Sequence, residues 1–310
     1  MMIRMGVSRR EVLAAMAGSM AIARASAKDN PRIAITMDDL NWHAIPGAQR
    51  GAVDDRILAA LERNHLRAAL FVIGQHGDTP VGRPIVKRWS ERGHMIGNHT
   101  WSHRWYDKLT EEEFGQDMLR CDAFVRDFRG FRPYFRFPAL KEGATRERRD
   151  WMRAFLKEHG YRNGAVTIDA SDWYYDQRLR ECLEKRANFD VNLFREPYLD
   201  HLWDRATYYD GLARKVLGRG IPHTMLVHYN ILNSYFLGDV MAMFRKRGWQ
   251  LVDAEHAFQD DVFRAQPDTA PAGESLVWAM AKETGRYENV LRYPGEDDVY
   301  EKPKLDRLGL

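Results

Sequence analysis

The chain has 310 residues, of which 45% are hydrophobic and 29% are charged, and its formal net charge is +3. This length is enough for one large domain or two small ones. The hydrophobic fraction argues against a disordered chain, and the lack of an apolar run of about 18 residues argues against a membrane-spanning one. The composition therefore indicates a folded globular protein.

The excess of positive charge lies entirely in the first 27 residues, which hold four arginines and one glutamate. The rest of the chain carries 43 basic and 43 acidic side chains. A balance of this kind gives no electrostatic attraction for nucleic acid or for an acidic membrane surface. Neither is predicted to be a partner.

Residues 1–27 are predicted to be a twin-arginine signal peptide. Paired arginines at 9–10 precede a short, weakly apolar stretch at 14–23, and small residues at 25–27 resemble a cleavage site. The alternative is an amphipathic helix of the folded domain, but a stretch so rich in Ala and Gly offers few core contacts. We therefore expect export of the folded protein to a periplasm or to the cell exterior.

The two cysteines, Cys121 and Cys182, belong to no Cys-x-x-Cys motif and have no Cys/His cluster nearby. They predict neither a zinc knuckle nor a disulfide framework. Each lies in a helix-like stretch, where a buried thiol is the usual state, although an oxidising compartment would permit one bridge.

From residue 32 the chain alternates apolar runs typical of strands with stretches that carry apolar residues at helical spacing. The predicted strands are residues 32–37, 68–74, 94–97, 133–137, 161–168, 223–229 and 249–252. The predicted helices are residues 51–64, 82–92, 110–128, 144–159 and 237–248. This alternation predicts a single domain built on a parallel sheet with crossover helices.

Two parts of the chain break the alternation. Residues 174–219 form a long helical insertion rich in aromatic and charged residues, and residues 254–310 form a tail punctuated by Pro and Gly. Each is expected either to form a wall of a groove or only to cover the fold.

Polar residues gather at the carboxyl ends of the predicted strands, where the loops of barrels and open α/β sheets form active sites. Asp38 and Asp39 come directly after the first strand. Such residues often serve only as turn or helix-cap residues. If both belong to one site, one carboxylate can bind a metal while the other handles a proton.

His99 and His103 are spaced as i and i+4, which on a helical turn brings two imidazoles to one side. The same spacing also occurs by chance on exposed helices. A carboxylate as third ligand would leave coordination positions open for water, and Asp39 is the natural candidate.

His228 ends an apolar strand and is either a buried core histidine or a general acid. A general acid needs a carboxylate that orients the ring, and Asp172 or Asp169 is close enough in the motif IDASDW to serve. The alternative role for these two aspartates is to cap the helix that follows.

Five ordered motifs, TMDDL, HTWSH, FRFP, DASDW and LVH, resemble those of the NodB-type polysaccharide deacetylases, carbohydrate esterase family four. The resemblance covers about residues 31–253. It implies that Asp38 is the catalytic base and that Arg136 holds its carboxylate. It also implies a metal site, usually zinc, with ligands Asp39, His99 and His103.

The same resemblance implies that Asp172 tunes the catalytic histidine, His228. It matches Trp173 and Leu226 to side chains that line the pocket for the acetyl methyl group. A backbone N–H near Ala139 is implied as the donor that stabilises the oxyanion.

The fold implied by the family is an α/β distorted (β/α) barrel with fewer than eight strand–helix units, the NodB homology domain. It assigns residues 28–253 to a catalytic domain and 254–310 to an extension packed on it. The implied activity is metal-dependent removal of N-acetyl groups from a glycan, with release of acetate. The alternative is an amidase of the same fold that acts on a small non-sugar amide.

The sequence departs from the family pattern at Leu40, Ala139 and Leu140, where the family prefers glycine or an aromatic residue. These changes alter loops rather than catalytic side chains, so they bear on the substrate more than on the reaction. The third motif also has a competing register in which Arg132 takes the place of Arg136. We prefer Arg136 because its spacing to the following proline fits the motif.

Overall fold

The computed structural model describes residues 30–45, 47, 49–292 and 297–310. The predicted signal peptide lies outside the described residues. Among those described, no helix combines the length and the hydrophobicity that crossing a bilayer requires. Cys121 and Cys182 are both buried and unbridged, as the sequence favoured.

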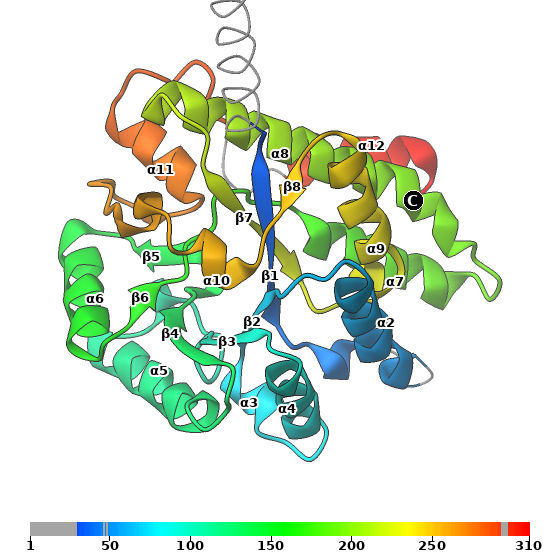
Figure 1. Ribbon diagram of the computed structural model, residues 1–310, viewed down its shortest axis with the longest axis horizontal. Coiled ribbons are helices and arrows are strands. Elements are labelled where there is room, and N and C mark those ends of the chain that lie inside the picture. The colour runs from blue at the N-terminus through cyan, green and yellow to red at the C-terminus, as the bar shows by residue number, and fades with distance from the viewer. Residues whose placement is uncertain (1–29, 46, 48, 293–296) are drawn as a thin grey trace, which may run out of the picture.

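A parallel sheet that curls into a distorted half-barrel forms the centre of the molecule (Figure 1). Its strand order is β6-β4-β3-β2-β1-β7, and β8 pairs with β1. The strands are β1 (Arg32–Asp39), β2 (Ala69–Val72), β3 (Met95–Asn98), β4 (Phe131–Phe135), β6 (Arg162–Asn163), β7 (Pro222–His228) and β8 (Gln250–Leu251). This architecture confirms the predicted fold class.

Strand β1 is almost completely buried and pairs along its length with β7. On its other side, the amino-terminal end pairs with β8 and the carboxyl-terminal half pairs with β2. Because all these pairings are parallel, the carboxyl ends of β1, β2, β3 and β7 meet at one edge. Asp38 and Asp39 are the last two residues of β1, rather than residues that follow it.

The predicted strand at 161–168 forms only in part. Residues Arg162–Asn163 pair with β4, and after Gly164 the chain crosses to β7, where the Ile168 N–H donates to the Thr224 carbonyl at 3.0 Å. A Cβ on Gly164 would lie 2.5 Å from the Phe71 ring, so only glycine permits this crossing. The segment connects β4 with β7 across the curled sheet.

The predicted helices are present as α2 (Arg50–Arg63), α4 (Gly82–Glu91), α5 (Glu111–Val125), α6 (Arg146–Glu158) and α9 (Ile231–Lys246). Helix α5 begins with a capping box between Thr110 and Glu113, as its sequence favours. Helix α9 begins six residues before the prediction, because Asn230 caps it by accepting a hydrogen bond from the Asn233 N–H.

The remaining elements belong to the insertion, to the carboxyl-terminal extension and to short connections. The insertion contributes α7 (Asp172–Lys185) and α8 (Arg195–Leu217). The extension contributes α10 (Ala254–Ala257), β9 (Ala272–Gly273), α11 (Leu276–Glu283) and α12 (Lys302–Leu308). The short connections include α3 (Gly74–Gly77) and β5 (Lys141–Gly143).

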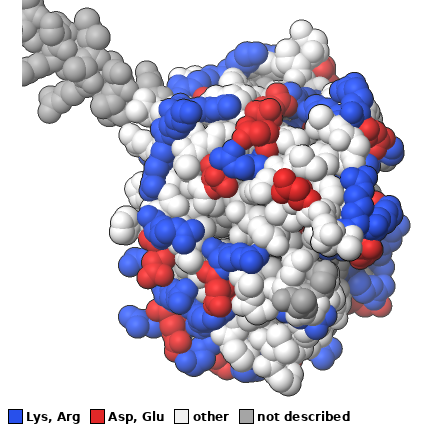
Figure 2. All heavy atoms as spheres, turned by 90° about the vertical axis from the view of Figure 1, so that its right-hand side faces the viewer, with Lys and Arg blue, Asp and Glu red and all other residues white. Residues whose placement is uncertain are grey.

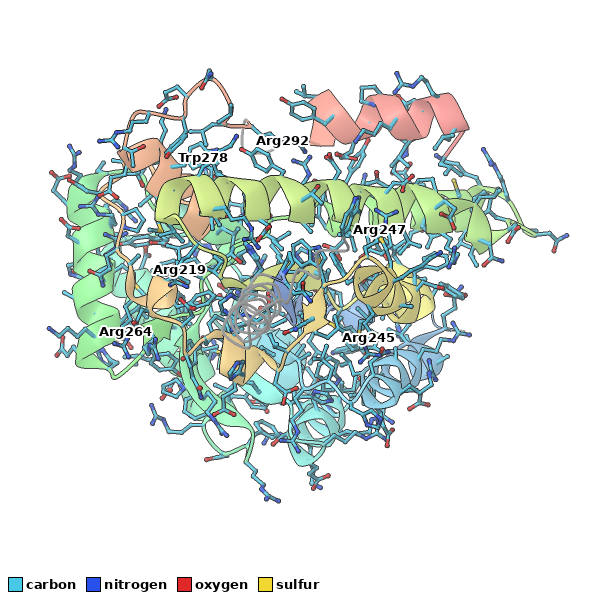
Figure 3. All side chains as sticks on the ribbon, turned by 45° about the horizontal axis from the view of Figure 1, so that its top comes forward. Arg219, Arg245, Arg247, Arg264, Trp278 and Arg292 are labelled. Atoms are coloured by element: carbon cyan, nitrogen blue, oxygen red, sulfur yellow. The ribbon has the colours of Figure 1, made fainter. Side chains whose placement is uncertain are left out.

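The extension packs on the insertion through a buried polar cluster. Glu301 is completely buried and accepts hydrogen bonds from Tyr175 at 2.8 Å and from Arg205 at 3.0 Å. Helix α11 packs on α8 at the other end of that helix (Figure 3). On the face shown in Figure 2, basic and acidic side chains are interspersed around an uncharged centre, which agrees with the balanced charge of residues 28–310.

Candidate active site

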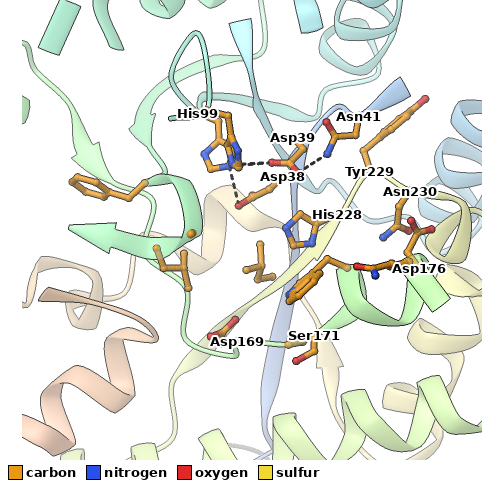
Figure 4. A pocket seen from close by; sticks show the side chains of 18 of the residues that line it. Asp38, Asp39, Asn41, His99, Asp169, Ser171, Asp176, His228, Tyr229 and Asn230 are labelled. Carbon is orange, nitrogen blue, oxygen red and sulfur yellow. Dashed lines mark hydrogen bonds and ion pairs between the residues drawn. The ribbon is translucent and has the colours of Figure 1, made fainter. Parts of the chain in front are cut away.

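A pocket of about 720 Å³ opens at the carboxyl ends of the strands. Its floor holds the polar residues that the sequence singled out, and Figure 4 shows Asp38, Asp39 and His99 clustered beside His228. The pocket is lined by Asp38, Asp39, His99, His103, Ala139, Asp169, Trp173, Leu226 and His228, among others. Parallel pairing of the strands brings residues separated by up to 190 positions into one cavity.

Asp38 and Arg136 form a buried ion pair at the end of β1. Arg136 Nη1 lies 3.0 Å from both carboxylate oxygens of Asp38, and its Nη2 donates to Thr36 Oγ1 at 3.2 Å. The guanidinium also stacks over the Phe71 ring, with 4.3 Å between Cζ and the ring centroid. Burial lowers the pKa of Arg136, and the charge of Asp38 opposes this shift. Thr36 and Phe71 thus hold the guanidinium that orients the Asp38 carboxylate.

The two candidate registers of the third motif have different partners. Arg132 is exposed on β4 and forms an ion pair with Glu255 at 2.7 Å. Arg136 lies just beyond β4, which spans 131–135 rather than the predicted 133–137. The structure therefore places Arg136, and not Arg132, at Asp38.

Asp39, His99 and His103 offer three ligand atoms that all lie within 4.8 Å of one another. Asp39 Oδ1 is 3.3 Å from Nε2 of each histidine, and it is buried without a hydrogen-bond donor. The other oxygen, Oδ2, accepts a hydrogen bond from Asn41 at 2.7 Å. An orphaned carboxylate oxygen that faces two imidazoles fits a divalent metal ion.

Protonation at this cluster also suits metal binding. His99 Nδ1 lies 2.8 Å from the Arg136 carbonyl, so Nδ1 carries the proton and donates, and Nε2 is left as a ligand atom. Burial lowers the pKa of His103 to about 4, which keeps its ring neutral. Burial would raise the pKa of Asp39, but the neighbouring His103 and His99 outweigh burial and hold that pKa well below its usual range.

The segment from His99 to His103 is a loop, and the prediction of a helical turn there was wrong. Thr100 and His103 have positive φ values of 64° and 59°. The His103 N–H donates to Thr100 Oγ1 at 2.9 Å, and Asp117 on α5 accepts from two further N–H groups of the loop. The two rings still approach to 4.8 Å between centroids. Side-chain hydrogen bonds, rather than helical spacing, bring them together.

Asp172 orients His228 on the opposite side of the pocket floor. Its Oδ1 accepts from His228 Nδ1 at 2.7 Å, and its Oδ2 accepts from the His228 backbone N–H at 2.7 Å. Burial lowers the pKa of His228, but the carboxylate of Asp172 outweighs burial and raises it to about 10. Asp172 makes these contacts, whereas Asp169 lies on the pocket wall (Figure 4).

Two asparagines that belong to none of the five motifs form hydrogen bonds with this pair. Asn230 and Asn233 donate to Asp172 Oδ2 at 3.0 and 2.8 Å, and Asn233 also donates to the His228 carbonyl at 2.9 Å. Tyr198 on α8 donates to Asn233 Oδ1 at 2.7 Å. The Asn230 cap of α9 is a sequence signal that could have located them, because it places the first turn of α9 beside β7.

The residues matched to the acetyl pocket also line the cavity. Trp173 is 45% exposed, whereas Leu226 is buried against Leu140 and Val166. Ala139 and Leu140 adopt left-handed conformations with φ values of 49° and 56°. Such conformations cost non-glycine residues of order 1 kcal/mol each, so neighbouring structure must hold them.

The carboxyl-terminal extension holds this loop. Strand β9 pairs with β5, the Glu274 N–H donates to the Leu140 carbonyl at 3.2 Å, and Lys141 forms an ion pair with Glu274. Gly273 has a φ of 126°, and a Cβ there would lie 1.9 Å from the Leu140 carbonyl oxygen. Only glycine allows β9 to approach the loop this closely.

Gly273→Ala is therefore expected to displace the loop at Ala139 and Leu140. Because a displacement of about 1 Å can slow catalysis up to about a hundredfold, we expect the activity that the resemblance implies, acetate release, to fall about tenfold or more, with a lower melting temperature. Gly211→Ala on α8 is the control, because a Cβ there meets nothing within 4 Å. Equal activity of the two variants would show that β9 does not position the loop.

The curled parallel sheet of this α/β protein places three candidate metal ligands beside a histidine that a carboxylate orients. Residues 25–164 match the family model described as polysaccharide deacetylase. The matched range contains Asp38, Asp39, His99, His103 and Arg136. Asp172 and His228 lie beyond it.

The chain is similar to curated deacetylases over part of its length. It is 30% identical over 149 residues to a peptidoglycan-N-acetylglucosamine deacetylase of Listeria monocytogenes, covering 48% of this chain and 28% of that protein. It is 34% identical over 139 residues to chitin deacetylase 1 of Saccharomyces cerevisiae, covering 44% of this chain and 43% of that protein. The aligned segment thus spans less than half of each relative.

The fold is also found among solved structures. The peptidoglycan deacetylase PdaC of Bacillus subtilis matches 75% of this chain and 92% of its own, with a TM-score of 0.51 and 20% identity. At this identity the match supports the shared fold alone.

Proposed function

We propose that this protein is a metal-dependent hydrolase that removes N-acetyl groups from an N-acetylated polysaccharide or oligosaccharide and releases acetate. The proposal is based on the arrangement of the polar side chains in the pocket. Asp38, held by Arg136 at 3.0 Å, lies beside the Asp39, His99 and His103 cluster and shares a pocket with the Asp172–His228 pair. The family match and the names of the relatives support the same reaction class.

Asp39, His99 and His103 would hold the metal ion, which we propose to be zinc because two imidazoles and a carboxylate are ligands that zinc favours. When bound, such an ion supplies Lewis-acid polarisation of water and of an amide carbonyl. Asn41 keeps Asp39 Oδ2 occupied, so that Oδ1 remains the oxygen directed at the two histidines.

Asp38 is proposed as the base and His228 as the acid. Asp38 accepts a proton from the attacking water as the new C–O bond forms, and Arg136 keeps the carboxylate oriented. His228, protonated because Asp172 raises its pKa, gives a proton to the amine nitrogen as the C–N bond breaks. The products are acetate and a free amine, and the pocket residues return to their starting protonation after proton exchange with solvent.

The loop at Ala139 is proposed to donate a backbone N–H to the oxyanion, because its left-handed backbone faces the pocket. Leu226 and Trp173 are proposed to contact the acetyl methyl group. Their apolar surfaces lie in the same cavity as His228.

The test is acetate release from a panel of N-acetylated glycans and small non-sugar amides, with the full chain loaded with zinc. Release from glycans, and its loss in Asp38→Asn, would support the proposal. Release from the small amides alone would favour an amidase of the same fold. No release from either class, from a protein that holds one metal ion per chain, would contradict both.

We also propose export through the twin-arginine route. Arg9→Lys combined with Arg10→Lys is expected to retain most of the protein in the cytoplasm, because the paired arginines mark residues 1–27 as a twin-arginine signal. Cell fractionation and immunoblotting measure this. An unchanged periplasmic or external fraction would contradict the proposed route.

A further inference from the structure

The pocket has walls that do not come from the repeating strand–helix units. The insertion and the extension both contribute side chains to it, and Figure 3 labels Trp278 and Arg292 where the extension runs along α8. The wall residues from these two parts are Asp176, Gln177, Arg180, Tyr209, Glu274, Trp278 and Arg292, and Trp173 lies directly before the insertion. The two parts that break the alternation of the chain thus form walls of the pocket.

Polar contacts fix these walls in place. Arg180 Nε lies 2.8 Å from Asp176 Oδ2 on the same helix. Trp278 Nε1 donates to the Arg292 carbonyl at 2.8 Å. Glu274 forms an ion pair with Lys141 next to the loop at Ala139 and Leu140. A ligand therefore meets a wall whose side chains are already ordered, which lowers the entropic cost of binding.

The walls carry balanced charge. Outside the metal cluster and the acid–base residues, the lysine and arginines that line the pocket are Lys141, Arg180 and Arg292, and the carboxylates are Asp169, Asp176 and Glu274. Arg292 is further paired with Asp204 at 2.7 Å. Because each of these cations has a carboxylate partner, the walls favour a neutral ligand over an anionic one.

The size of the pocket limits what enters it. About 720 Å³ lies within the range of roughly 300–1,000 Å³ in which cavities enclose most of a small ligand. This space suits a disaccharide or trisaccharide. Trp105 and Trp173, which are 47% and 45% exposed, present aromatic surface for sugar rings where they line the pocket.

We propose that the substrate is a short, neutral N-acetylated saccharide, or the end of a longer chain, whose terminal units enter the pocket. This inference rests on the proposed function and narrows it. Side chains of α7 and of the extension line the same pocket as Asp38 and His228, so an internal unit of a long chain would have to pass between these walls to reach them. A polymer is then deacetylated only at an end.

The experiment uses the zinc-loaded full chain and β-1,4-linked N-acetylglucosamine oligomers of one to six units. Acetate is counted per chain, and mass spectrometry locates the unit that loses its acetyl group. We expect the disaccharide, trisaccharide and hexasaccharide each to lose acetyl groups only from terminal units. Removal from internal units of the hexasaccharide would overturn the inference.

A pair of variants on α7 tests the wall directly. Gln177→Trp fills space that the second or third sugar would occupy, whereas Glu184→Trp adds the same ring to an exposed site of the helix outside the pocket. We expect Gln177→Trp to lower kcat/KM for the trisaccharide about tenfold relative to that for the monosaccharide. An unchanged ratio, as expected for Glu184→Trp, would overturn the assignment of the α7 wall.

The failure of this inference is distinguishable from that of the proposed function. Acetate that appears from any of these sugars and stops on chelation supports the proposed function, wherever on the chain it comes from. Loss of acetyl groups from internal units would overturn only the proposed restriction to chain ends. If no oligomer yields acetate, this inference fails, and the panel of glycans and small amides decides the proposed function separately.

Discussion

Replacing Asp38 by asparagine is expected to lower kcat about a thousandfold while leaving the bound metal nearly unchanged. Asparagine keeps the shape of the carboxylate but cannot accept a proton from water at neutral pH. Alanine is the less informative change, because it would leave the buried Arg136 guanidinium without its carboxylate, at a cost of about 3–5 kcal/mol. Acetate release and metal analysis of the purified variant measure the two effects.

His99→Ala is the matched comparison, because His99 faces both aspartates from the same floor of the pocket. It removes one of the three ligand atoms, so metal content and activity are expected to fall together. If Asp38→Asn and His99→Ala lose the same share of metal, then Asp38 is also a ligand and the division of roles between Asp38 and Asp39 is wrong.

Asp172→Asn is expected to lower kcat about a hundredfold or more and to move the alkaline limb of the pH profile to lower pH. In the native protein Asp172 raises the pKa of His228 to about 10, so the acid stays protonated across the neutral range. The asparagine removes the negative charge. Its amide would also donate to Nδ1, which moves the remaining ring proton to Nε2 and leaves a neutral imidazole that is a poor acid.

The same pair has a consequence for stability. Since the pKa of His228 is raised in the folded state, the pair stabilises the fold fully below the ordinary value of 6.5. This stabilisation is lost as the pH rises from there through about 10. Asp172→Asn should therefore reduce the pH dependence of the melting temperature across this interval.

Asp169→Asn is the control, because Asp169 lies on the wall of the same pocket. It should leave the alkaline limb in place. Two results would contradict the assignment of Asp172 to His228, namely an equal shift in the Asp169 variant or no shift in the Asp172 variant.

The sequence was enough to predict the fold and the residues that meet in the pocket. Strand β1 is recognisable because its apolar run is buried on both faces, and the two aspartates mark its carboxyl end. Parallel order then determines that residues after other strands lie beside Asp38 and Asp39. The residues alone left Asp169 and Asp172 open as partners of His228, and the family resemblance implied Asp172, which lies 2.7 Å from His228 Nδ1.

Local backbone geometry was harder to predict. The loop from His99 to His103 depends on positive φ at Thr100 and His103, and no glycine marks either position. Instead, backbone N–H groups of the loop stabilise it by donating to the distant Asp117 carboxylate and to the nearby Thr100 Oγ1. A prediction from helical spacing uses only residues that are close in sequence. It therefore favoured a helical turn between His99 and His103.

The role of the carboxyl-terminal extension could not be predicted either. Its contact with the active-site loop depends on two residues of β9 and on the missing side chain of Gly273. A strand of two residues gives no periodic signal in the sequence. Whether the extension forms a wall of a groove or only covers the fold could therefore be decided only from the structure.

The most direct test of the central claim follows acetate released from N-acetylglucosamine trisaccharide by the full chain, first as purified, then after chelation, and then after zinc is returned. Release is expected to stop when the metal is removed and to recover when one zinc ion per chain is restored, whereas His99→Ala is not expected to recover. Release that continues in the fully chelated protein would contradict a metal-dependent site at Asp39, His99 and His103.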